Sequence, residues 1–116
     1  MKSLTLCFAL LFAPAAFAQT VSCQGIAPDW SLEFDESQAR FTLSSETRMT
    51  LRLTTNAEGQ EWPRAFTLVG DNDTAIALIE QETCLALPYR GHVLTQRAQT
   101  PILLTGCCTV DESSNE

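Results

Sequence analysis

The sequence predicts an all-β fold, a small antiparallel barrel or sandwich of about seven strands that is stapled by two disulfides. Apolar and polar residues alternate repeatedly between turn-forming segments, and no segment has the periodicity and end signals of an amphipathic helix. Four cysteines follow a segment that is typical of secretory signals, so we expect them to be oxidised. Together these observations favour a small exported β domain.

Residues 1–18 have the composition of a signal peptide. Lys2 supplies a positive charge, an apolar run covers residues 4–12, and Ala16 and Ala18 are the small residues that a signal peptidase reads. The apolar run is too short to span a bilayer. We therefore expect a periplasmic or secreted protein with no membrane insertion after cleavage. The expected organisation is a signal peptide over residues 1–18, a single β domain over 19–110 and a disordered acidic tail over 111–116.

The charge balance restricts the class of partner. The chain has 7 basic and 14 acidic residues, a net charge of −7, and cleavage that removes Lys2 would make it −8. Nucleic acids and anionic membranes need clustered positive charge, so we expect neither as a partner. A cationic protein or a small ligand in the bacterial envelope is easier to accommodate. We favour the simpler explanation that the acidic surface only keeps a small exported protein soluble, and we expect a monomer.

The clearest strand pattern lies in the first half of the domain. Alternation over residues 30–34, a polar turn over 35–38 and renewed alternation over 39–43 predict a hairpin whose apolar faces coincide. Residues 48–54 repeat the pattern and predict a third strand of an antiparallel meander. Its expected inward residues are Met49, Leu51 and Leu53.

The remaining segments are less regular. Residues 74–81 are apolar on both faces, which predicts a strand covered on both sides, with a short helix as the alternative. Further strands are expected at 66–69, 89–96 and 101–108, and irregular segments at 19–28, 55–64 and 82–88.

The cysteines predict how distant segments are joined. Cys7 leaves with the signal peptide, so Cys23, Cys84, Cys107 and Cys108 remain. Neighbouring side chains of an extended segment point to opposite faces, so the adjacent pair should reach different partners. Two pairings satisfy this condition, and each loop would contribute roughly 3 to 4.5 kcal/mol in the chain-entropy model. The alternative is a reduced vicinal dithiol that binds a soft metal such as zinc or copper(I).

Catalytic signals are weak. His92 is the single histidine, no Gly-x-Ser-x-Gly turn occurs, and Asp71 and Asp73 stand in a turn where such residues bond their own backbone. We therefore expect no catalytic, cofactor-binding or metal site and no enzymatic activity. An enzyme or metal-handling protein that uses His92, the turn carboxylates or the thiols is the alternative.

The hypothesised partner contacts are Trp62, Tyr89, Arg64 and Arg90, because aromatic and arginine side chains dominate contact energies. Trp62 stands in a polar loop, where it either folds back onto the core or faces a ligand. The simpler alternative is that Trp62 and Tyr89 only cap the core.

Two sequence clusters carry a resemblance to a known family. The first is Gly25-Ile26-Ala27-Pro28-Asp29-Trp30-Ser31-Leu32, and the second runs from Cys84 and Tyr89 to Leu104-Thr105-Gly106-Cys107-Cys108. They resemble a family of small, mostly uncharacterised exported bacterial proteins, predicted to be periplasmic proteins or lipoproteins, with a G-x-x-P-x-W-S-L opening and an L-x-G-C closing motif.

The resemblance implies a small β fold and a bridge between Cys84 and Cys107, which leaves Cys108 to pair with Cys23. The chain departs from the family at Leu85-Ala86-Leu87, where a Met-Ser-Gly-like stretch is usual. The resemblance supplies no established activity. We expect a non-enzymatic binding or interaction module. A more specific alternative is an inhibitor of a basic cell-wall hydrolase such as lysozyme, because periplasmic lysozyme inhibitors are also small disulfide-bearing β-barrels.

Overall fold

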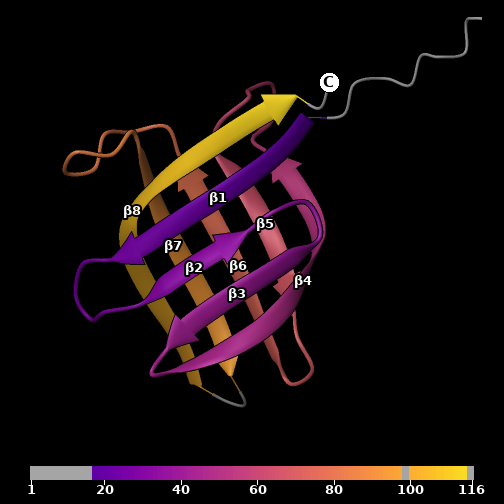
Figure 1. Ribbon diagram of the computed structural model, residues 1–116, viewed down its shortest axis with the longest axis vertical. Coiled ribbons are helices and arrows are strands. Elements are labelled where there is room, and N and C mark those ends of the chain that lie inside the picture. Colours follow the sequence, from indigo (N-terminus) through magenta and orange to yellow (C-terminus); the bar gives the residue numbers. More distant parts are fainter. Residues whose placement is uncertain (1–16, 98–99, 115–116) are drawn as a thin grey trace, which may run out of the picture.

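Eight antiparallel strands close into a barrel in the computed structural model, which describes residues 17–97 and 100–114 (Figure 1). Each strand pairs with its neighbours in sequence, and β8 pairs back with β1. This confirms the all-β prediction and selects the barrel, with one strand more than expected. None of the described residues forms a helix that could cross a membrane. The strands are β1 (Phe17–Gly25), β2 (Ser31–Phe34), β3 (Gln38–Leu43), β4 (Ser45–Asn56), β5 (Arg64–Val69), β6 (Asp73–Glu80), β7 (Tyr89–Arg97) and β8 (Thr100–Ser114).

The additional strand is β1, and the prediction of an irregular lead-in over residues 19–28 was wrong for its first part. Val21 and Cys23 point into the barrel and are buried, whereas Gln24 is exposed. Over its whole length β1 pairs with β8, so its partner lies far away in the sequence. A pairing of such long range leaves little trace in the local pattern.

The same pairing corrects the expected tail. Strand β8 continues through Ser114, with Asp111 opposite Thr20 and Glu112 opposite Gln19, so residues 111–114 are ordered against β1 and not a disordered tail. Residues 115–116 lie outside the described residues, as do residues 1–16 of the expected signal peptide. The expected cleavage point after Ala18 falls within β1, and residues 19–25 of that strand lie beyond it.

The interior of the barrel is filled by apolar side chains. In the β2–β3 hairpin the predicted alternation is confirmed, since Leu32, Phe34 and Phe41 are buried and Glu33 and Arg40 are exposed. Aromatic rings pack against one another in tilted pairs, with centroids 4.8 Å apart for Phe34 and Phe66 and 6.3 Å apart for Trp30 and Phe41. The packed cluster comprises Val21, Cys23, Trp30, Leu32, Phe34, Ala39, Phe41, Met49, Phe66, Leu68, Ala75, Ala77, Ile79, Val93, Leu104 and Cys108.

Strand β4 differs from the prediction in its second half. Met49 points inward, but the register with β5 shifts between Leu51 and Leu53. Such a bulge adds one residue to one strand and reverses the alternation that follows. Leu53, expected in the core, is consequently 63% exposed.

Strand β6 resolves the alternative between strand and helix for residues 74–81. The segment pairs with β5 and β7 as a strand. Ala75, Ala77 and Ile79 face the core, and Ile76 lies on the outer surface. Strand β6 is apolar on both faces, but only its inner face is covered, so Ile76 on the outer face stays exposed.

One end of the barrel is closed by Trp30, which precedes β2 and is 5% exposed. Gly25 and Gly106 are paired across the β1–β8 seam, and their lack of side chains makes room for the indole. A Cβ on Gly106 would lie 2.7 Å from Trp30 Cζ2 and would collide with the Gln24 carbonyl oxygen. The opening and closing sequence motifs therefore meet around one side chain.

Both expected disulfides are present. Cys23 and Cys108 face each other across the seam inside the barrel, with Cα atoms 4.0 Å apart. Cys107 points outward and bonds to Cys84, which attaches the β6–β7 connection to β8. The adjacent cysteines thus reach different partners because they lie on opposite faces of one strand.

Candidate binding site at one end of the barrel

The candidate site lies at the end of the barrel opposite Trp30. The β2–β3 turn, the β4–β5 and β6–β7 connections, the start of β1 and the end of β8 lie at this end. In Figure 1 the start of β1 and the end of β8 are at the top and the β2–β3 turn is at the right. We call it the acidic end, after the carboxylates of Asp35, Glu36, Glu61 and Glu112.

An aromatic cluster covers part of the core at this end. The rings of Trp62 and Tyr89 lie 4.9 Å apart at an interplanar angle of 51°, and both side chains are half-buried against the core. Arg64 Cζ lies 4.2 Å from the centre of the Trp62 ring, a cation–π arrangement. Trp62 therefore covers the core and keeps part of its surface in solvent.

The guanidinium of Arg64 is held in place by the β4–β5 connection. Its Nε donates a hydrogen bond to the Glu61 carbonyl oxygen at 3.0 Å, and its Nη2 lies 3.2 Å from Glu61 Oε2. The Arg64 side chain is only 14% exposed, against 71% for Glu61. The positive charge is thus covered while the carboxylate that pairs with it faces solvent.

Two shallow hollows lie at this end, and Arg64 lines one of them. One, of about 380 Å³, is lined by Gln19, Glu61, Arg64 and Glu112. Gln19 Nε2 donates to Glu112 Oε2 at 2.8 Å across β1 and β8. The other, of about 250 Å³, also reaches Gln19 and is lined further by Phe34, Asp35, Glu36, Leu51, Thr54 and Phe66. An apolar floor and a polar rim are typical of ligand sites at barrel mouths.

The rim is fixed by the β2–β3 turn. The backbone N–H groups of Ser37 and Gln38 donate to Asp35 Oδ1 at 2.9 Å and 3.0 Å. These hydrogen bonds, that of Gln38 first, favour the ionised form and lower the pKa of Asp35 below its ordinary value. Asp35 therefore keeps its negative charge in mildly acidic solution.

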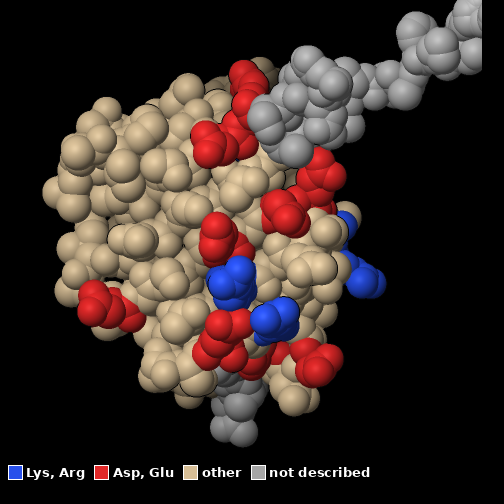
Figure 2. All heavy atoms as spheres, viewed as in Figure 1, with Lys and Arg blue, Asp and Glu red and all other residues tan. Residues whose placement is uncertain are grey.

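The acidic end has an excess of negative charge. Four carboxylates border the two hollows, and Arg64 is the only basic side chain among the residues lining them. In Figure 2, acidic side chains appear at the upper end of the visible face, whereas blue and red side chains lie together lower down, over β2–β4. The potential at this end therefore favours a cation.

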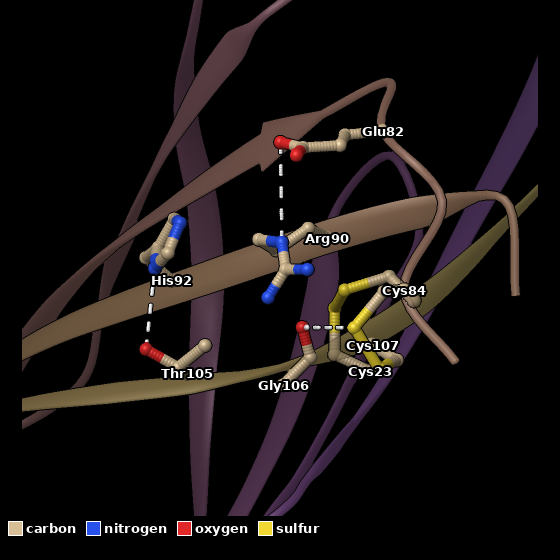
Figure 3. Close-up of a disulfide and its surroundings, with 9 residues drawn as sticks. Cys23, Glu82, Cys84, Arg90, His92, Thr105, Gly106 and Cys107 are labelled. Atoms are coloured by element: carbon tan, nitrogen blue, oxygen red, sulfur yellow. Dashed lines mark hydrogen bonds and ion pairs between the residues drawn. A yellow bond between two sulfur atoms is a disulfide. The ribbon is translucent and has the colours of Figure 1, made fainter.

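The structure brings three of the four hypothesised contacts together. Trp62, Tyr89 and Arg64 form the cluster described above. Arg90 follows Tyr89 in β7 and points to the outside of the barrel, where its Nε lies 3.9 Å from Glu82 Oε1 (Figure 3). It belongs to a different surface.

His92 also lies on the outer face. Its Nδ1 is 3.3 Å from Thr105 Oγ1 (Figure 3). Its Nε2 is 3.4 Å from Glu80 Oε2. None of the hollows described above reaches this group, so the arrangement stabilises the β6–β7–β8 surface without enclosing a substrate. The four cysteines are all in disulfides and offer no thiolate. Within the described ranges no three His, Cys, Asp or Glu side chains are grouped to hold a metal.

The carboxylates of this site were not among the predicted contacts. Gln19 lies in the segment predicted to be irregular, Glu112 in the predicted disordered tail, and Asp35 and Glu61 in a predicted turn and a predicted loop. The alternation of Val21 and Cys23 with polar neighbours was a signal for β1, and it would have indicated a partner strand. Nothing local indicates that three separate segments meet at one rim.

A scan against models of known protein families gave no match, and neither did searches of curated proteins and of solved structures.

Proposed function

We propose that this protein is an exported, non-enzymatic binding module whose acidic end binds a cationic protein or peptide in the cell envelope. The observation that carries the proposal is the charge arrangement at this end. Four carboxylates border two hollows that share Gln19, and the one arginine lining them is neutralised by Glu61 and covered by Trp62. Opposite charge steers a partner toward such a surface, and the half-buried aromatic rings supply apolar contact area.

The two disulfides support maturation in an oxidising compartment. Together with the composition of residues 1–18 they favour the periplasm or the exterior as the place of action. A closed barrel also suits this role, because its cross-linked wall holds the rim residues in place before a partner arrives.

A matched pair of double variants tests the proposal. Glu36→Gln with Glu112→Gln removes two charges at the acidic end, and Glu33→Gln with Glu46→Gln removes two charges from the outer face of β2–β4. In each pair one carboxylate is engaged by a neighbouring side chain, Glu112 by Gln19 and Glu46 by Arg48. The two changes are therefore comparable in charge and in lost contacts.

Binding of a lysine decapeptide, measured by calorimetry at low salt, should weaken by about fivefold in the first double variant. Each of the two exposed charge pairs contributes about 0.5 kcal/mol, and about 1 kcal/mol together corresponds to about fivefold. The control should match the unaltered chain. Equal losses in both variants, or no binding by the unaltered chain, would contradict the proposal.

A basic cell-wall hydrolase is one specific cationic partner. We expect the chain from Gln19 onward to reduce the lytic activity of lysozyme when present in excess, and the acidic-end double variant to reduce it less. Undiminished lysis would contradict the hypothesis that this protein inhibits lysozyme. The peptide-binding result would still decide whether the acidic end binds cationic partners.

A further inference from the structure

The outer side of β5–β8 carries no charged side chain over three consecutive rows of cross-strand neighbours. On a typical surface with a quarter to a third charged residues, about three or four of these twelve positions would be charged. His92 is the only titratable residue among them. We call this surface the uncharged outer face; its rows are Val69–Thr74–Gln96–Pro101, Thr67–Ile76–Leu94–Leu103 and Ala65–Leu78–His92–Thr105.

The middle row is the most apolar. Ile76, Leu94 and Leu103 lie directly opposite one another on β6, β7 and β8 and are 43%, 40% and 68% exposed. The bulge in β4 places Leu53 at the end of the same row, opposite Thr67 and 63% exposed. Contiguous exposed apolar side chains mark an interaction surface, whereas isolated ones need no explanation.

The charge distribution indicates the occupant. A partner selected by charge has nothing to bind on this face, and a chain with net charge −7 is repelled by the acidic end of its own copy. Two copies therefore approach with least repulsion through their uncharged faces. We propose that this chain forms a symmetric homodimer in which the two uncharged outer faces pack together.

The three exposed apolar side chains of β6–β8 can pair about a two-fold axis. Leu94 lies between Ile76 and Leu103, so an axis running between the copies parallel to β7 sets Ile76 of one copy against Leu103 of the other. Four strands about 4.8 Å apart and five residues of about 3.4 Å rise give a face of about 330 Å² in projection. A standard interface buries about 800 Å² of accessible surface per partner, so this face would form its centre and the polar neighbours its rim. We expect a dissociation constant in the micromolar range.

The dimer does not depend on the proposed binding function, because the acidic end lies at the barrel mouth and the uncharged outer face on its side. Each dimer would present two acidic ends. Salt separates the two interactions. Screening should strengthen the association of two acidic copies, and it should weaken the binding of a cationic peptide.

Sedimentation velocity over a concentration series, at low and high sodium chloride, tests the proposal on the chain from Gln19 onward. We expect the dimer fraction to rise with concentration and with salt. Leu94→Asp and Leu103→Asp should each weaken association at least about tenfold. The first would bury the carboxylates of the two copies close together at the axis, and the second would bury a carboxylate against Ile76 of the other copy. Leu85→Asp is the matched control, since Leu85 is 80% exposed in the β6–β7 connection, outside this face, and should change association less than about twofold.

All these positions are on the surface, so thermal unfolding should verify that each variant folds. A monomer at every concentration and salt level would overturn the proposal, as would an equal loss in the Leu85→Asp control. A monomer that binds zwitterionic phospholipid vesicles would also overturn it and would assign the face to a lipid surface. None of these results would alter the outcome of the peptide-binding test of the acidic end.

Discussion

The two tryptophans of this chain lie at opposite ends of the barrel and have different surroundings. Trp30 is 5% exposed and rests on Gly25 and Gly106 at the β1–β8 seam. Trp62 is half-buried and lies between Tyr89 and Arg64, beside carboxylates that face solvent. One end of the barrel is therefore filled by its own aromatic side chain, and the other keeps an aromatic surface exposed within an acidic rim.

This difference separates stability from binding. A residue that is buried on a close-packed backbone contributes mainly to folding. A half-exposed aromatic residue beside carboxylates that face solvent contributes less to folding and remains free to contact a partner. The two ends can thus be altered independently.

Replacing each tryptophan by alanine is the most severe test of this separation. Trp30→Ala should lower the free energy of unfolding by about 3–5 kcal/mol, because it leaves a cavity at the seam. Trp62→Ala should cost less than about 2 kcal/mol, since part of its surface is already in water. Urea denaturation followed by circular dichroism measures both. An equal loss of unfolding free energy in the two variants would show that Trp30 and Trp62 contribute equally to folding, which contradicts the proposed difference between the two ends.

Removal of the outer disulfide tests whether the acidic end depends on the β6–β7 connection. In the chain-entropy model, closing the loop of 23 residues between Cys84 and Cys107 contributes about 3.4 kcal/mol. The double variant Cys84→Ser and Cys107→Ser should lose about that amount in urea denaturation. The nuclear magnetic resonance signals of Tyr89 should also broaden, because Tyr89 directly follows this connection and the connection is no longer attached to β8. Unfolding at the same urea concentration as the unaltered chain would contradict the structural role of this disulfide.

A smaller effect is expected from the turn that fixes the rim. Because hydrogen bonds lower the pKa of Asp35 in the folded state, ionised Asp35 stabilises the fold at neutral pH. This stabilisation is lost as the pH falls through the lowered pKa, below about 4. The melting temperature of Asp35→Asn should therefore be slightly below that of the unaltered chain at about pH 6, and the difference should shrink by about pH 2. A difference that does not change with pH would assign the effect to the side-chain shape instead of its charge.

The parts of the fold that local patterns determine were predictable. The β2–β3 hairpin follows from alternation on either side of a polar turn, and the opposite directions of Cys107 and Cys108 follow from strand geometry. The parts that depend on closure were not. Strand β1 and the end of β8 order each other across the whole length of the chain, and the bulge in β4 reverses the direction of Leu53 without any proline or glycine to mark it.

The candidate site divides in the same way. Residue type alone selected Trp62, Tyr89 and Arg64 as candidate contacts, and the structure brings these three side chains together. The choice of Arg90 failed to join them because residue type does not give the face of a strand. The carboxylates of Asp35, Glu61 and Glu112 come from three separate segments, and only closure of the barrel places them at one end.

The most direct measurement of the acidic end as a binding site is a titration with a lysine decapeptide, followed by the two indole N–H signals in a nitrogen–proton correlation spectrum. The chain contains two tryptophans, so the signals are assigned with a single Trp62→Phe variant. We predict that the Trp62 signal shifts in a saturable manner that salt suppresses, while the Trp30 signal stays in place. A shift of the Trp30 signal alone, or no shift of either signal at saturating peptide, would contradict the account.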